Sequence, residues 1–285
     1  METAGRAGQR IIDSHCHIYP AKVADRAVGA VDSFYGGLPV EPFDGTTGTL
    51  LLKGKAAGIT QFVVHSVATT PGQVPAINRF IAEEVKQSDG AFIGLGALHP
   101  DSETLREDTE HLMELGLKGV KIHPDFQKFF ADEPKAMRLF ELCEEKSLPV
   151  LVHTGDYRYD YSNPERIAHV LQAFPDLTLI GAHFGGWSVW DRAQALLPDY
   201  PNMMVDTSSS FFWMEEERAL DMIRAYGPER VMFGTDYPMW RADKELAFFS
   251  RLDLTEEERQ RILWKNCARL YGAQGFLQGD KGSEY

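Results

Sequence analysis

The sequence predicts a (β/α)₈ barrel, an α/β fold in which eight strand–helix units close into a ring. Eight short apolar runs alternate with longer amphipathic segments along the 285 residues. Several runs are rich in β-branched residues, as the buried strands of a parallel sheet tend to be. No glycine-rich phosphate loop follows the first run, which disfavours an open nucleotide-binding sheet.

The expected strands are the apolar runs 11–15, 59–65, 91–98, 118–123, 149–153, 177–183, 202–207 and 230–235. Helical periodicity occupies the segments between them, at 73–88, 101–115, 135–147, 163–174, 188–197 and 214–226. Prolines and capping residues mark several helix starts, as at Pro134 and Asn163. Gly90 and Gly116 follow helical stretches, where a left-handed residue commonly ends a helix.

Residues 18–48 interrupt this rhythm with three prolines and five glycines. We interpret them as a loop excursion after the first strand, with a short helix near 21–32 that folds over the barrel mouth. The chain shows no low-complexity linker and no internal repeat. Residues 1–285 are therefore expected to form a single domain.

The composition excludes several classes of protein. Acidic residues number 42 against 29 basic ones, a formal charge of −13, which argues against nucleic-acid or membrane partners. No apolar run approaches the ~20 residues that cross a bilayer, and the first ten residues lack an apolar signal segment. Three cysteines without paired spacing argue against a disulfide framework. We expect a cytoplasmic protein that acts on a small molecule.

Most of the nine histidines fall at or just after the end of an expected strand. These are His15, His17, His65, His99, His123, His153 and His183. The C-terminal ends of barrel strands form the active-site face, so these side chains are expected to gather in one cup.

His15 and His17 are two residues apart, which places them on one face of the first strand. Two imidazoles in this arrangement can bind one divalent ion. His153 and His183 end later strands, and Asp236 follows the last one, where a carboxylate can reach the same point. A set of this kind with one open position predicts a catalytic metal site.

These motifs resemble the amidohydrolase superfamily, in particular its amidohydrolase-2 branch of metal-dependent barrels. The matching segments are IIDSHCH (11–17), GVKIHP (119–124), VLVHTG (150–155), LIGAHFGG (179–186), VDTS (205–208) and FGTDYP (233–238). The resemblance implies that His15, His17, His153 and Asp236 bind the metal, with Zn²⁺ the commonest ion and Mn²⁺ another. It also implies that His183 polarises the substrate or handles a proton. Such barrels are often dimers or larger, so a homo-oligomer is among the expectations.

Binuclear members of the superfamily need a bridging carboxylate on the fourth strand, where this chain has Lys121. A carbamylated Lys121 would hold a second ion. An unmodified lysine would instead neutralise a substrate carboxylate or extend towards the mouth. We favour one ion, because nothing in the sequence shows carbamylation.

Other side chains near the strand ends are candidates for substrate contacts. The set comprises Lys121, His123, Arg158, Trp187 and Arg241. Aromatic residues in the loops after strands five to eight predict a flat slot for a ring. The arginines offer bidentate pairing to a carboxylate.

We expect a metal-dependent hydrolase of a small, carboxylate-bearing amide, ester or lactone, acting through a metal-activated water. Asp236 would bind the metal and transfer the proton, and His183 would help to stabilise the oxyanion. The alternative is a non-oxidative decarboxylase, a lyase that removes CO₂ from an aromatic or unsaturated acid at the same site. A non-catalytic metal-binding barrel is disfavoured, because every expected ligand position holds a competent side chain.

Overall fold

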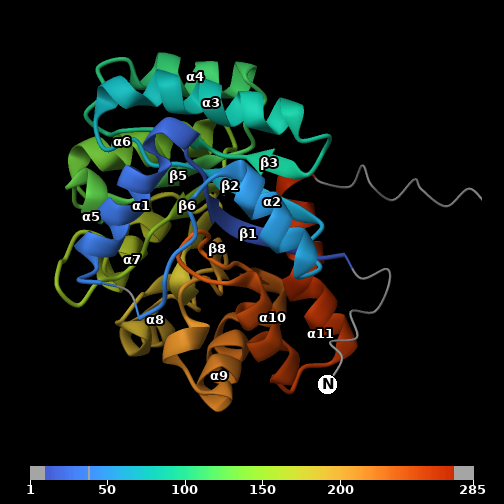
Figure 1. The fold of residues 1–285 in the computed structure, drawn as a ribbon. Helices are drawn as coiled ribbons and strands as arrows, with labels where there is room; N and C mark the ends of the chain where they lie inside the picture. Colours follow the sequence, from blue (N-terminus) through green and yellow to red (C-terminus); the bar gives the residue numbers. More distant parts are fainter. Residues whose placement is uncertain (1–9, 38, 273–285) are drawn as a thin grey trace, which may run out of the picture.

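The computed structural model describes residues 10–37 and 39–272 and confirms the (β/α)₈ barrel. Parallel strands form the centre of the molecule and helices surround them (Figure 1). The strands are β1 (Ile12–His17), β2 (Gln61–His65), β3 (Phe92–Gly94), β4 (Gly96–Ala97), β5 (Val120–Ile122), β6 (Val150–Val152), β7 (Leu179–Gly181), β8 (Met203–Asp206) and β9 (Val231–Met232). The predicted domain 1–285 extends beyond the described residues at both ends.

Backbone hydrogen bonds complete the ring where the regular ladders stop. β3 and β4 are two parts of the third barrel strand, and Leu95 and Gly96 donate to the neighbouring strands on opposite sides. The ring closes between its last and first strands, where the Ser14 amide donates to the Phe233 carbonyl at 2.8 Å. The carboxyl ends of the strands therefore meet around one opening.

The helices confirm the expected alternation. They are α1 (Ala21–Phe34), α2 (Thr47–Ala56), α3 (Val74–Gln87), α4 (Leu105–Glu114), α5 (Pro124–Gln127), α6 (Pro134–Glu145), α7 (Pro164–Ala173), α8 (Trp190–Leu196), α9 (Glu216–Tyr226), α10 (Ala242–Arg251), α11 (Glu256–Gln260) and α12 (Asn266–Tyr271). The helix predicted near 21–32 is α1. α2 is the helix that was expected between the excursion and Gly58. Among the described helices, none has the length and apolarity of a membrane span.

The core has two apolar layers, one inside the ring and one between the strands and the helices. In β6, Leu151 belongs to the inner layer, whereas Val150 and Val152 belong to the outer one. Cys267 and Tyr271 of α12 pack with the inner layer. Because both faces of each strand are buried, the strands read as nearly continuous apolar runs.

A buried asparagine fastens α3 to the third barrel strand. The Asn78 side chain donates to the Ala97 carbonyl at 3.1 Å and accepts from the Ala97 amide at 2.7 Å. An alanine at position 78 would leave the amide and the carbonyl of Ala97 buried without hydrogen-bond partners. Each such group costs about 1–3 kcal/mol.

We therefore expect Asn78→Ala to lower the free energy of unfolding by about 2–4 kcal/mol. Urea denaturation followed by circular dichroism measures this change. Arg79→Ala, on the exposed side of the same helix, is the control and should stay within about 0.5 kcal/mol of wild type. A loss below 0.5 kcal/mol in Asn78→Ala would contradict the assigned role.

Candidate metal centre

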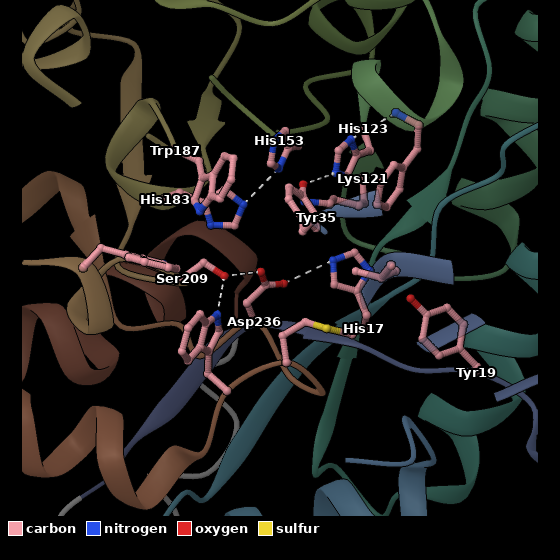
Figure 2. A pocket seen from close by; sticks show the side chains of 15 residues that line it. His17, Tyr19, Tyr35, Lys121, His123, His153, His183, Trp187, Ser209 and Asp236 are labelled. Carbon is pink, nitrogen blue, oxygen red and sulfur yellow. Dashed lines mark hydrogen bonds and ion pairs between the residues drawn. The ribbon is translucent and has the colours of Figure 1, made fainter. Parts of the chain in front are cut away.

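Three candidate ligand atoms meet at the carboxyl end of the barrel. His15 Nε2 lies 3.3 Å from His17 Nε2 and 3.3 Å from Asp236 Oδ1, and His17 Nε2 lies 3.5 Å from the same oxygen. Figure 2 shows His17 and Asp236 turned towards each other. Two atoms that each lie about 2.1 Å from one ion are roughly 3.0–3.4 Å apart at octahedral or tetrahedral angles. The spacing of these atoms therefore fits one divalent ion.

Asp206, at the end of β8, orients His15. Its Oδ2 atom lies 2.8 Å from His15 Nδ1, and its Oδ1 atom accepts from the backbone amides of His183 at 3.1 Å and Ser208 at 3.0 Å. An ionised carboxylate only accepts hydrogen bonds, so the proton of His15 is on Nδ1. The lone pair of Nε2 then faces the site, as a metal ligand requires.

Asp236 is held from its other side by Ser209, which Trp240 holds in turn. Ser209 Oγ donates to Asp236 Oδ2 at 2.5 Å, and Trp240 Nε1 donates to Ser209 Oγ at 2.7 Å. Asp236 and Ser209 have positive φ angles of 65° and 49°. This left-handed backbone costs a non-glycine residue roughly 1–2 kcal/mol. The strained turns after β8 and β9 aim both side chains into the cavity (Figure 2).

A second histidine pair lies across the cavity (Figure 2). His153 Nδ1 is 3.0 Å from His183 Nε2, and His183 Nδ1 is 2.9 Å from the Ser208 carbonyl. Because a carbonyl only accepts, His183 carries its proton on Nδ1 and accepts from His153. His153 Nε2 then keeps a lone pair, has no hydrogen-bond partner and lies 4.0 Å from Asp125 Oδ2. The structure thus places His153 in the same cavity but groups it with His183 and Asp125.

Two buried clusters of ligand-type side chains result, one formed by His15, His17 and His65, the other by His123, Asp125 and His153. Burial lowers the pKa of His15, His65, His123 and His153 well below the usual value. These rings are therefore neutral at pH 7, which is the form that binds metals.

Lys121 is the buried cation of this region. Its Nζ atom lies 3.2 Å from His15 Nε2, and only 1% of the residue is exposed. Burial lowers the pKa of Lys121 to about 8, although the carboxylates of Asp236 and Asp206 act in the opposite direction. The single ion that we favour, with Lys121 unmodified, stays a prediction, and a second ion on a carbamylated Lys121 stays the alternative.

The two predicted substrate arginines have different surroundings from those expected. Arg158 pairs with Asp156 through Nε at 2.9 Å and Nη2 at 2.6 Å, and its Nη1 donates to the Phe34 carbonyl at 2.7 Å. Arg241 is half-exposed, pairs with Asp243 at 3.1 Å and does not line the cavity. The structure therefore does not bring Arg241 to the site, because a nearby surface carboxylate binds it.

Arg158 fastens the end of α1 over the cavity. Its guanidinium lies 4.9–5.6 Å from the ring centroids of Phe34, Tyr35, Tyr159 and Trp187. Contacts of this kind are attractive because the ring faces carry negative charge. Arg158 thus stabilises the aromatic wall of the site through these contacts.

His123 and Trp187 do line the cavity, and Tyr35 lies between them (Figure 2). The Tyr35 hydroxyl is 3.3 Å from His123 Nε2, and its ring contacts the Trp187 ring edge-on at 4.9 Å. His123 also stacks on His153 at 3.8 Å. These rings form one wall of the site.

A family model described as amidohydrolase (Amidohydro_2) matches residues 12–273. The chain belongs to this family. Gamma-resorcylate decarboxylase from Polaromonas sp. is 24% identical to this chain in an alignment of 245 residues that covers 68% of this chain and 74% of that protein.

Solved structures of similar proteins share the fold of this chain. 5-Carboxyvanillate decarboxylase from Sphingomonas paucimobilis is 18% identical, with a TM-score of 0.75 over 93% of this chain and 99% of that one. The enzyme of the same name from Novosphingobium aromaticivorans was solved with manganese and 4-hydroxy-3-methoxy-5-nitrobenzoic acid. It is 15% identical, with a TM-score of 0.75 over 95% of this chain and 98% of that one.

Three residues of the site, Asp206, Ser209 and Tyr35, were not singled out from the sequence. Asp206 lies in the VDTS segment, which carried the resemblance and was the available signal. Ser209 and Tyr35 lie in loops, where nothing in the local sequence indicates which side chain points inwards. His65 was expected in the cup from its place at a strand end, and it ends β2 and packs edge-on against His17 at 4.5 Å.

Asp206→Asn should weaken metal binding by about 10- to 100-fold, because the amide no longer fixes His15 in its ligand form. Titration of the metal-free protein with Mn²⁺ in a calorimeter measures the affinity. Asp243→Asn, which changes a surface carboxylate, is the matched control. An affinity within twofold of wild type in Asp206→Asn would refute the orienting role.

Arg158→Leu should release the end of α1, since it removes the hydrogen bond to Phe34 and the contacts with the rings. Hydrogen exchange followed by mass spectrometry is expected to show faster exchange at residues 31–37, by at least about tenfold. Arg241→Leu is the control and should leave these amides unchanged. Unaltered exchange in Arg158→Leu would show that other contacts hold this segment.

Proposed function

We propose that this protein is a non-oxidative decarboxylase of a small aromatic carboxylic acid that depends on one divalent metal ion. The main observation behind this proposal is that His15, His17 and Asp236 lie together beside a cavity with aromatic walls. The decarboxylase names of its relatives support this alternative over the hydrolysis that we expected first. A cytoplasmic enzyme with a small-molecule substrate is part of the same proposal.

The walls of the cavity suit a planar ring. The aromatic lining comprises Tyr19, Tyr35, Phe126, Trp187, Trp213 and Trp240. Flat apolar surfaces with a few polar groups are typical of sites that hold small molecules in one orientation. The polar groups here converge at one end, where the candidate ligands lie.

His15, His17 and Asp236 would hold the ion, and the lone pair of His153 Nε2 is the further candidate ligand. A divalent ion bound there would supply positive charge that attracts the substrate carboxylate or a neighbouring hydroxyl. The manganese in the Novosphingobium aromaticivorans structure supports Mn²⁺ beside Zn²⁺ as the occupant.

Decarboxylation exchanges one group on the ring for another. A proton bonds to the ring carbon that bears the carboxylate, and the bond to the carboxylate then breaks and releases CO₂. The electron pair of that bond returns to the ring, so one proton enters for each CO₂ that leaves. The reaction therefore needs a positioned acid.

We assign the proton to the Asp236 carboxyl, because Ser209 holds its Oδ2 atom beside the cavity. His183 would act through His153, since its Nδ1 donates to the Ser208 carbonyl and its Nε2 accepts from His153 Nδ1. The aromatic wall around Tyr35 would keep water away from the reacting carbon.

Asp236→Asn should reduce turnover by about 10²–10⁴-fold, the usual contribution of a general acid, with the fold intact. Wild type and variant are assayed for CO₂ release from 2,6-dihydroxybenzoate and 5-carboxyvanillate, and their circular dichroism is compared. Asp243→Asn is the control and should keep full activity.

A panel of lactones and aryl esters tests hydrolysis in the same preparation. The proposal predicts CO₂ release from an aromatic acid and no acid production from the panel. Hydrolysis of a lactone or ester without any CO₂-releasing substrate would overturn the decarboxylase proposal and restore the first expectation.

A further inference from the structure

A second and larger cavity lies beside the metal centre, between α1 and α3. Its volume is about 990 Å³, whereas the cavity at the metal centre is about 40 Å³. The two share His17, Tyr19, Val31 and Phe126 in their linings. Ligand sites usually measure about 300–1,000 Å³, so the cavity at the metal centre is small for a ligand site, and the shared lining makes its neighbour the adjoining space.

One wall of this groove is a stripe of apolar side chains on α1. Val23, Ala27, Ala30 and Phe34 line the groove and recur at the spacing of one helical face. The buried residues of the same helix, Ala24 and Val28, account for its packing on the core. The stripe is thus additional to the face that holds α1 in place.

The opposite wall comes from α3. Ala76, Ile77 and Phe80 line the groove, whereas Val74 and Ile81 of this helix are buried in the core. Facing apolar surfaces of two helices normally pack at 8–10 Å between their axes. Here they leave a slot whose inner end reaches His17.

The rim of the groove is basic in an acidic protein. Lys22, Arg26 and Lys128 line it and are exposed. Within the described part of the chain, none of the three pairs with a carboxylate. Asp125, which also lines the groove, is buried and accepts from Ser162 at 2.9 Å. The rim would therefore attract an anion despite the net charge of −13.

We propose that the groove binds an extended apolar substituent of the substrate. The substrate class is then an aromatic carboxylic acid whose carboxylate lies at the metal centre and whose alkyl chain or second ring lies between α1 and α3. The cations of the rim attract the acid in its anionic form. This inference rests on the proposed function, because it names the substrate class of the same site.

Binding of 2-hydroxy-4-alkylbenzoates tests the proposal, since a chain opposite the carboxylate leads away from the metal centre. The methyl, propyl and pentyl compounds are titrated into the Mn²⁺-loaded protein by calorimetry. The dissociation constant should fall by about fourfold for each added methylene. A dissociation constant independent of chain length would overturn the proposal.

Ala27→Trp and Ala76→Trp fill the groove from opposite walls. Each should reduce the ratio of the methyl to the pentyl dissociation constant to near one. Ala21→Trp is the matched control, because Ala21 is exposed on the same helix and does not line the groove. A dependence on chain length that survives both groove substitutions would overturn the assignment of the subsite.

Two parallel measurements separate this inference from its rivals. A wild-type dimer that both groove substitutions dissociate, with no effect of chain length, would make the groove an interface and refute the subsite. CO₂ release is recorded for each compound. Binding that depends on chain length without CO₂ release would support the groove as a subsite and refute the decarboxylase activity. CO₂ release without a dependence of binding on chain length would support the decarboxylase activity and refute the subsite.

Discussion

The buried carboxylate of Asp206 joins three strand ends at the mouth of the barrel. It accepts from His15 Nδ1 of β1, from the His183 amide after β7 and from Ser208 after its own strand. Burial of a carboxylate is costly unless its oxygens are hydrogen-bonded, and these donors meet that requirement. The same bonds direct the lone pair of His15 into the site and hold the turn that presents His183. The candidate chemistry therefore depends on a residue that does not face the cavity.

Neutral nitrogen atoms are crowded at this centre. His15 Nε2 and His17 Nε2 are 3.3 Å apart, and both ring nitrogens of His65 are buried without a hydrogen-bond partner. Lone pairs at such distances repel one another unless a proton or a cation lies between them. Burial lowers the pKa of His15 and His65, so a second proton on either ring is disfavoured. A divalent ion beside Asp236 would relieve the repulsion between the lone pairs without a further proton, since it binds neutral imidazoles and a carboxylate together.

The strands and the excursion after β1 contribute different parts of the site. Strand ends supply the metal-binding and proton-handling side chains, as in other barrels of this architecture. The excursion supplies Tyr35, the wall that Arg158 fastens, and the stripe on α1 that faces α3. A loop on a rigid scaffold can change without disturbing the core, so this segment is where the substrate preference of the enzyme would be set.

The sequence by itself determined the barrel, the helix after the first strand and the types of side chain at the strand ends. Periodicity and the spacing of His15 and His17 are local properties, and strand ends converge in any barrel. Tertiary structure alone decided which partners these side chains meet. It joined Arg158 to Asp156, Arg241 to Asp243 and His153 to His183, and it opened the groove between α1 and α3. A charge or an imidazole takes whichever partner the folded chain brings within a few ångströms, and that distance is not encoded in any one segment.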